Sequence, residues 1–413
     1  QIIDKSLTSE DIAADALVTV KADFGKPQQI QKAKTLFGSK RRNSRGWDLH
    51  DKNDIEKIEL ARTNYKDYQW KARPMIAGKI SGKEIVIIKN PANHNDVIGS
   101  VTFANENDVT TAINSAKNWA DCHQKERSHV LNNCANIFEK NFGQLFAVLT
   151  REAGKTSSDA IGELREAVDF LRYYSNEAEK FSNSSARGIF TCISPWNFPL
   201  AIFTGQIAAA LSVGNGVLAK PAETTTICAS IAVDFFYQAG VPKNVLQLLP
   251  GEGASIGASI VGHKYIDGVC FTGSTPTALS INKSMAHYSP IGAPFIAETG
   301  GLNAMIVDST ALPEQAIKDI IASSFQSAGQ RCSALRVLYL QHDIATDFLA
   351  MLFGAMDELV IADPWLLSTD IGPVINAAAK TKITSHIAIA KTENRLLKQL
   401  KSPLKGTFIG PAV

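Results

Sequence analysis

From Gly188 onward the chain alternates short apolar segments with longer helical ones, and this alternation limits its fold more than any other feature. The segments expected to be strands are 188–193, 216–220, 245–249, 268–272, 294–297 and 303–307. The segments expected to be helices are 201–212, 225–239, 254–261, 276–284 and 314–327. Short apolar strands that alternate with helices predict a parallel sheet covered on both faces. We therefore expect an α/β protein.

The part of the chain before Gly188 shows a different pattern of expected helices and strands. Residues 1–70 are typical of mixed helix and loop, residues 86–102 predict short strands with a turn at 90–93, and residues 107–181 predict helices. A short basic cluster is interpreted as a solvated linker surface: Lys40, Arg41, Arg42 and Arg45.

The run 188–219 contains no charged residue, a pattern that also occurs in membrane spans. Prolines, glycines and asparagines interrupt it, and in lipid those breaks would leave backbone groups without hydrogen bonds. We therefore expect a buried core and no membrane span. The hydrophobic fraction of 45% is an ordinary globular value, and a net charge of +2 gives no reason to expect a nucleic-acid partner. Six cysteines without Cys-x-x-Cys spacing favour a reducing, cytoplasmic compartment.

Cys332 is the cysteine with the most distinctive surroundings, the segment Ser327-Ala-Gly-Gln-Arg-Cys-Ser-Ala334. Small neighbours leave room for a substrate beside the sulfur, and Arg331 with a nearby backbone dipole would favour the nucleophilic thiolate. The alternative is a small buried hydrophobic residue, which is our interpretation of the other five cysteines.

Two further residues have side chains suited to work beside a nucleophile. Glu298 ends an expected strand before Gly300 and Gly301, and partial burial there would suit it to general-base catalysis. Its alternative is an exposed turn glutamate. Asn197, held between Pro195 and Pro199, offers a rigid amide donor of the kind that an oxyanion hole needs. Its alternative is a kinked loop before the next helix.

Three turns follow expected strands. Taken together, they are equally consistent with nucleotide binding and with ordinary loops between strands and helices. Lys220 and Glu223 place an ammonium and a carboxylate at the end of one strand, where a dinucleotide ribose is bound in doubly wound sheets. The segment 251–257 resembles a G-x-G-x-x-G turn with one extra residue. Gly273 and Ser274 open a helix whose N-terminus suits a phosphate. A metal site is not expected, because the one His and Cys group has no zinc spacing: Cys122, His123, His129 and Cys134.

Five motifs in this order resemble the successive signatures of the aldehyde dehydrogenase superfamily, over residues 72–413: Pro195-Trp-Asn-Phe-Pro199, Lys220-Pro-Ala-Glu223, Phe271-Thr-Gly-Ser274, Glu298-Thr-Gly-Gly301 and Gly329-Gln-Arg-Cys332. Three segments resemble, more narrowly, the glutamate-semialdehyde dehydrogenase half of the bifunctional bacterial proline utilization A family: 42–49, 298–308 and 329–336. The resemblance implies a Rossmann-type NAD-binding domain and an α/β catalytic domain. Its domains would be a linker at 1–70, the NAD-binding domain at 71–297 and an incomplete catalytic domain at 298–413.

The resemblance also implies a role for each matching residue. Cys332 would attack the aldehyde, Asn197 would hold the oxyanion, and Glu298 would activate the hydrolytic water. Cofactor contacts would come from seven residues: Ser194, Pro195, Trp196, Lys220, Glu223, Gly273 and Ser274. Ser333 would bind the substrate carboxylate and Phe325 would line the aliphatic stem.

The implied activity is NAD-dependent oxidation of L-glutamate γ-semialdehyde, which forms from 1-pyrroline-5-carboxylate. Two alternatives stay open: another semialdehyde as substrate, or a nucleotide-binding fragment without turnover. The resemblance further implies a homo-oligomeric full-length protein in the bacterial cytoplasm or at the inner face of its membrane. FAD would belong only to a proline dehydrogenase half before this region. The sequence departs from the family pattern at Ala278 and Leu302, and neither change should affect the chemistry. We also expect the chain to be truncated at both ends.

Overall fold

The computed structural model describes Thr8 and residues 33–413. The chain divides into two units, 1–43 and 44–413, which are described separately. In the first unit, the short helix η1 (Ala33–Thr35) is followed by Arg41, whose guanidinium lies 3.9 Å from the centroid of the Phe37 ring. Most of the region that we interpreted as a linker, residues 1–7 and 9–32, lies outside the described residues.

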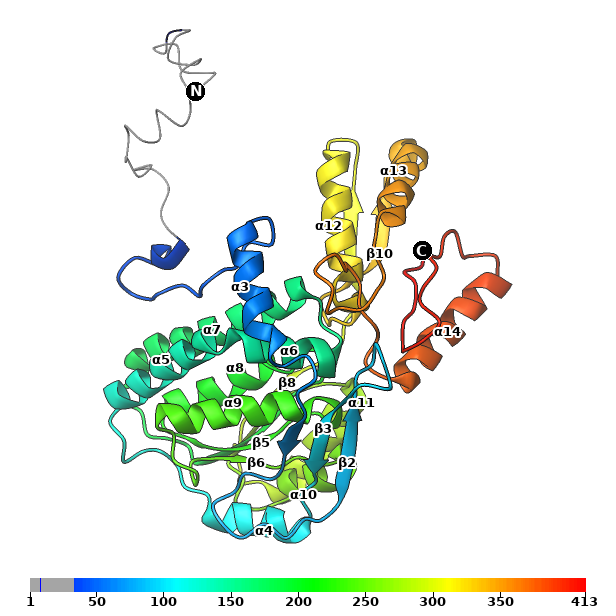
Figure 1. Cartoon of the computed structure of the whole chain (residues 1–413). Helices are drawn as coiled ribbons and strands as arrows, with labels where there is room; N and C mark the ends of the chain where they lie inside the picture. The colour runs from blue at the N-terminus through cyan, green and yellow to red at the C-terminus, as the bar shows by residue number, and fades with distance from the viewer. Residues whose placement is uncertain (1–7, 9–32) are drawn as a thin grey trace. The chain divides into compact units, whose positions relative to one another are not determined.

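A five-stranded parallel sheet is the centre of the second unit (Figure 1). Its strands are β4 (Ile189–Ile193), β5 (Gly216–Lys220), β6 (Leu246–Leu248), β7 (Gly268–Thr272) and β8 (Phe295–Glu298). They lie in the order β6-β5-β4-β7-β8. The chain therefore moves outward from β4 first in one direction and then in the other, which is the doubly wound order of a Rossmann-type sheet. Ligands of such sheets bind at the carboxyl ends of the strands where the order reverses, here between β4 and β7.

Helices cover both faces of this sheet, as the alternation predicted. One face packs against α8 (Ala201–Ser212) and α9 (Thr226–Ala239), and on these two helices pack α5 (Gln124–Lys140), α6 (Phe142–Ala153) and α7 (Ser157–Glu177). The other packs against α4 (Glu106–Ser115), α10 (Ala258–Val261) and α11 (Thr275–Tyr288). Within β5, Val217 and Ala219 belong to the first core and Leu218 to the second. A strand buried on both faces explains why its sequence is apolar throughout.

A smaller sheet precedes the central one, in the order β1-β3-β2. Its strands are β1 (Trp70–Ala72), β2 (Ile85–Lys89) and β3 (Val97–Thr102), and the β2–β3 turn falls at the expected 90–93. Before it, α3 (Lys52–Thr63) packs against α6 so closely that a Cβ on Gly143 would lie 2.4 Å from the Ala61 carbonyl oxygen.

The region after Glu298 contains a second, two-stranded parallel sheet of β9 (Asn303–Val307) and β10 (Leu335–Leu340). Two helices, α12 (Pro313–Phe325) and α13 (Ala345–Asp357), pack on one of its faces around a separate apolar core (Figure 1). The last helix is α14 (Ala377–Thr392). The segment 303–307 was expected as a strand and forms one, but it pairs with β10 and not with the central sheet, because the Gly300-Gly301 turn separates β8 from β9.

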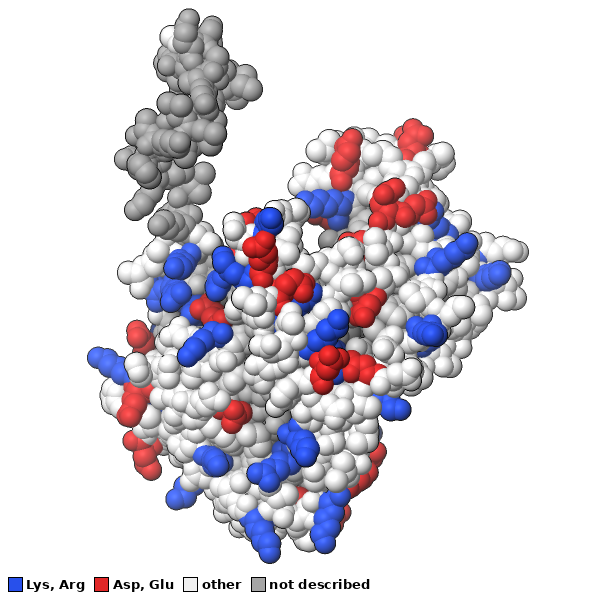
Figure 2. Space-filling model, in the orientation of Figure 1, with Lys and Arg blue, Asp and Glu red and all other residues white. Residues whose placement is uncertain are grey.

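Among the helices in the described part of the chain, none combines the length and the apolar character that a membrane crossing requires. Basic and acidic side chains are interspersed over the face of the molecule seen in Figure 2.

Candidate active site

The loop after β4 carries Asn197 to the segment that precedes Cys332. The Ser194 backbone N–H donates to the Lys220 carbonyl oxygen (3.2 Å), which ties the start of this loop to the end of β5. The Asn197 side-chain Nδ2 donates to the Gln330 carbonyl oxygen (3.0 Å). The predicted amide donor and the predicted nucleophile, 135 residues apart in the sequence, therefore belong to one local structure.

Cys332 follows a tight turn and is exposed. Ser327, Ala328 and Gly329 have φ values of 57°, 54° and 70°, in the left-handed region that costs energy for residues other than glycine. The side chain of Gln330 holds the turn, since its Oε1 accepts from the Ile375 N–H (2.9 Å) and its Nε2 donates to the Ser327 carbonyl oxygen (3.0 Å).

Glu298 is the last residue of β8, at the carboxyl edge of the central sheet. Its carbonyl oxygen accepts from the Gly273 N–H (3.0 Å), so it adjoins the turn after β7. On its other side, the Gly300-Gly301 turn leads to Asn303, whose Nδ2 donates to the Cys332 carbonyl oxygen (2.8 Å). The Glu298 side chain is exposed, so the partial burial expected from the sequence is not found.

The buried Lys220 and the partly exposed Glu223 form an ion pair at the end of β5. Lys220 Nζ lies 2.8 Å from Glu223 Oε1, which also accepts from the Gly253 N–H (2.7 Å). Gly253 begins the π-helical turn η4 (Gly253–Gly257), so the 251–257 segment forms a helical turn and not an open phosphate loop. Burial lowers the pKa of Lys220, and Glu223 opposes this shift. Burial acting alone would raise the pKa of Glu223, but Lys220 holds it below its ordinary value.

Gly273 and Ser274 lie just before α11, at the point where the strand order reverses. A Cβ on Gly273 would lie 2.6 Å from the Phe271 ring, so no larger residue fits without a shift. Ser274 Oγ accepts from the Thr277 N–H (3.3 Å) as the N-cap. Pro276 has no N–H and Thr277 donates to Ser274, so the Thr275 N–H at this helix terminus is left to suit the cofactor's pyrophosphate, and the Glu223 carboxylate suits its ribose hydroxyls. The residues present therefore fit a dinucleotide.

Comparison with known proteins identifies the family. The model of the aldehyde dehydrogenase family matches residues 79–413. The chain belongs to the aldehyde dehydrogenase family. It is 43% identical to the bifunctional protein PutA of Klebsiella aerogenes, across 100% of this chain and 33% of that protein. It is 34% identical to a 1-pyrroline-5-carboxylate dehydrogenase of Bacillus cereus, across 82% of this chain and 71% of that protein.

Comparison with a solved structure supports the same family assignment. The structure of 1-pyrroline-5-carboxylate dehydrogenase from Thermus with bound NAD superposes with a TM-score of 0.85 at 29% identity, across 90% of this chain and 77% of that one. The predicted aldehyde dehydrogenase fold is confirmed. The chain spans about a third of the length of the PutA relatives that it matches.

The other predicted site residues differ in their surroundings. Ser333 is exposed directly after Cys332, and Pro195 and Trp196 are half-buried in the loop before Asn197. Phe325 lines an apolar cavity of about 480 Å³ between α12, β10, α13 and the residues Ala412 and Val413. Cys332 is not among the described residues that line this cavity.

Arg331 interacts differently from our expectation. Its guanidinium donates to Asp159 on α7 (3.1 Å) and lies 5.5 Å from the centroid of the Phe198 ring. Its charge is therefore paired with a buried carboxylate, a partner that no sequence pattern predicted.

The other cysteines are free thiols in less accessible places. Cys134, Cys192, Cys228 and Cys270 are buried and Cys122 is half-buried. Burial raises the pKa of the Cys134 and Cys228 thiols well above the ordinary value, which disfavours the reactive thiolate. Within the described residues, no group of three or more His, Cys, Asp and Glu side chains is arranged to hold a metal ion.

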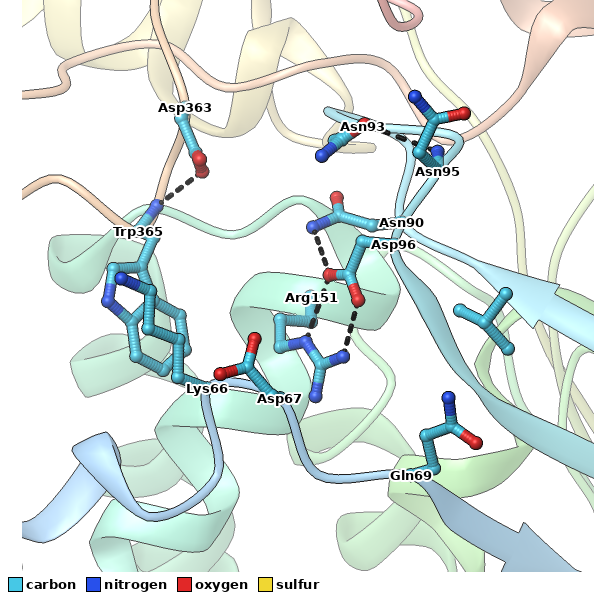
Figure 3. Close-up of a pocket in the computed structure, with 11 residues that line it drawn as sticks. Lys66, Asp67, Gln69, Asn90, Asn93, Asn95, Asp96, Arg151, Asp363 and Trp365 are labelled. Carbon is cyan, nitrogen blue, oxygen red and sulfur yellow. Dashed lines mark hydrogen bonds and ion pairs between the residues drawn. The ribbon is translucent and has the colours of Figure 1, made fainter.

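A polar cavity of about 470 Å³ lies apart from all of these motifs (Figure 3). Figure 3 shows Arg151 of α6 aimed at Asp96, with Asn90 on the other side of that carboxylate. Arg151 Nε donates to Asp96 (3.0 Å), and its Nη1 donates to the carbonyl oxygens of Tyr65 and Tyr68 (3.0 and 2.6 Å). These contacts join α6, the β2–β3 turn and the segment before β1, which is a structural role.

Sequence reasoning missed three buried residues, on α7 and just before it, that contact the loops of the candidate site. Lys155, Asp159 and Glu163 are all buried and reach the two loops that carry Asn197 and Cys332. The signal that could have found them is three charged residues at four-residue spacing on the apolar face of a predicted helix.

Proposed function

We propose that this chain catalyses the NAD-dependent oxidation of L-glutamate γ-semialdehyde to L-glutamate. The observation that carries the proposal is the Asn197–Gln330 hydrogen bond, which puts a side-chain amide beside the segment that presents Cys332. The relatives named 1-pyrroline-5-carboxylate dehydrogenase support the choice of substrate, since that compound opens in water to the semialdehyde.

In the proposed reaction, the Cys332 thiolate adds to the aldehyde carbon and forms a carbon–sulfur bond. The negative charge that develops on oxygen is held by the Asn197 amide and the Cys332 backbone N–H, which lowers the barrier to addition. When bound, NAD supplies the acceptor for the hydride that leaves this carbon. Glu298 takes a proton from the water that attacks the resulting thioester. The carbon–sulfur bond then breaks, which yields the carboxylic acid and regenerates the thiolate.

The observed positions support the proposed cofactor contacts. Lys220 and Glu223 would contact the adenosine ribose, and Gly273 with Ser274 would contact the pyrophosphate. Ser194, Pro195 and Trp196 would line the same site between β4 and β7. A carboxylate at Glu223 repels a second negative charge, so we propose NAD as the cofactor in preference to NADP. Substrate contacts from Ser333 and Phe325 are proposals of the same kind.

Features of a whole protein remain proposals as well, because the chain spans a third of its PutA relatives. They are the domain boundaries at 70/71 and 297/298, a homo-oligomeric assembly, a cytoplasmic location, and an FAD-dependent proline dehydrogenase half.

The test is NADH formation by the chain, and by a C-terminally extended chain, with NAD and 1-pyrroline-5-carboxylate. Turnover that vanishes in Cys332→Ala, while NAD still binds, supports the proposal. Equal rates with succinate semialdehyde would favour the broader semialdehyde alternative. Bound NAD without NADH from either chain would favour a nucleotide-binding protein, and turnover retained in Cys332→Ala refutes the nucleophile.

A further inference from the structure

The N-terminal part of α7 and the residues just before it present a buried charged face toward the candidate active site. Lys155, Asp159 and Glu163 follow one another at four-residue intervals, and their exposed fractions are 2%, 1% and 3%. Burying charges is costly unless each one is paired and hydrogen-bonded. A face with three of them therefore calls for a specific explanation.

Lys155 lies at the meeting point of three segments. Its Nζ donates to the Asn197 backbone carbonyl oxygen (2.6 Å) and to Ser327 Oγ (2.9 Å), and it lies 3.4 Å from Glu163 Oε1. Two of the three ammonium protons are therefore used in hydrogen bonds, and Glu163 Oε1, which has no hydrogen-bond partner, lies beside the ammonium as its counter-charge. One buried side chain thus connects the backbone of the oxyanion donor to the turn before the nucleophile.

The two carboxylates of this face hold the neighbouring backbone. Glu163 Oε2 accepts from the N–H groups of Leu200 and Ala201 (3.2 and 2.9 Å), at the start of α8 and just beyond the Asn197 loop. Asp159 accepts from Arg331 (3.1 Å), the residue before Cys332. The face therefore contacts both loops at more than one point.

The turn at Ser327 is the part of the site that most needs external support. Ser327 and Ala328 both have left-handed backbone conformations, which persist in residues other than glycine only when the surroundings hold them. Ser327 is buried, and its hydroxyl is the group that Lys155 contacts.

We propose that Lys155 is a positioning residue that sets the alignment of the Asn197 amide with the Cys332 sulfur. The inference rests on the proposed function, because alignment matters only if these two residues react with one aldehyde. It competes with a simpler role in which Lys155 only neutralises the buried charge of Glu163.

Three variants separate these roles, tested in the same chain that shows turnover. Lys155→Met removes the ammonium and keeps the aliphatic stem. The double variant Lys155→Met/Glu163→Gln removes both charges, so no unpaired charge is left buried. Ser327→Ala removes one contact of Lys155 and changes no charge. Lys180→Met is the matched control, since Lys180 forms an exposed ion pair with Glu177 (2.6 Å) just beyond the other end of α7.

We expect kcat to fall by about a hundredfold in both Lys155 variants, the scale of a displacement of about 1 Å at a reacting group. Ser327→Ala should lower kcat by about tenfold, a smaller effect because it removes one contact of several. The KM for NAD should stay within twofold of the wild-type value, because Lys220 and Glu223 are unchanged. The rate at which iodoacetamide alkylates Cys332, followed by mass spectrometry of its peptide, should also change in the Lys155 variants and not in Lys180→Met.

Wild-type kcat in the double variant would overturn the proposal, because it would leave only the charge-neutralising role. If Lys155→Met does not fold, the double variant and Ser327→Ala decide the question, and wild-type kcat in both overturns it. Cys332→Ala is run beside them. Turnover retained in that variant contradicts the proposed function itself, whereas loss of turnover in Cys332→Ala with full turnover in the Lys155 variants contradicts only the positioning role.

Discussion

The Asn197 side-chain amide donates to the Gln330 carbonyl oxygen over 3.0 Å, across the boundary between the central sheet and the segment that carries Cys332. An amide nitrogen carries two protons, so this bond orients the group and leaves one proton for a ligand. The donor is therefore held in place before any substrate arrives, which is the condition under which an oxyanion hole is effective.

Asn197→Ala removes this donor. We expect kcat to fall by about 10²- to 10³-fold, the usual effect of losing one oxyanion-hole donor. NAD affinity should not change. Steady-state NADH formation and NAD titration by fluorescence measure the two effects. A variant with wild-type kcat would show that Asn197 only orders the loop.

Glu298→Gln keeps the size of the side chain and removes the base. If Glu298 activates the hydrolytic water, the first turnover still forms NADH and the thioester then accumulates. Rapid mixing should show a burst of about one NADH per active Cys332, followed by a steady rate lower by about 10²-fold or more. Mass spectrometry should detect the acylated Cys332 peptide. Loss of the burst as well would mean that Glu298 acts before hydride transfer.

Glu223→Gln tests cofactor selection. The substitution removes the charge that should repel the NADP phosphate and frees the Lys220 ammonium, which now lies 2.8 Å from Glu223. We expect the ratio of kcat/KM for NADP to that for NAD to rise by about tenfold, which corresponds to about 1.4 kcal/mol. Glu252→Gln is the control, because Glu252 acts on Lys220 only through its charge. An equal change in both variants would contradict a specific role for Glu223.

Glu152 predicts a pH dependence of stability. Burial raises its pKa from 4.5 to about 8, although its oxygens accept from the Ile227 and Cys228 N–H groups at the start of α9 (both 2.8 Å). The folded state therefore holds this proton more tightly than the unfolded state. Between pH 4.5 and 8 the unfolded chain binds fewer protons, so the free energy of unfolding falls as the pH rises.

Glu152→Gln has no proton to release, so its stability should vary less over the same range. Relative to this variant, the wild-type midpoint of thermal unfolding should fall by about 3 °C or more from pH 5 to pH 8.5. Differential scanning calorimetry at several pH values measures the difference. Glu179→Gln, at an exposed position, is the control and should follow the wild type. Parallel curves for Glu152→Gln and the wild type would contradict the raised pKa.

Local pattern was sufficient to predict the elements of the central sheet. The expected segments 216–220, 268–272 and 201–212 coincide with β5, β7 and α8. Each of them is a short apolar run bounded by turn residues, so its conformation follows from nearby residues. Four of the five motifs were equally local, since each one includes the end of a strand or the turn after it, whereas the motif 329–332 follows a helix.

The long-range contacts that hold the site together could not be predicted from local pattern. Three features depend on pairs far apart in the chain: the sheet that β9 joins, the partner of Arg331 and the contacts of Lys155, which lies 172 positions before Ser327. No periodicity within a segment encodes which distant group a buried charge will meet. The sequence by itself therefore determined the doubly wound sheet and the candidate nucleophile, base and amide donor. Only the tertiary structure decided how they are held together, because buried charges and strained turns are stabilised by partners that folding brings from elsewhere.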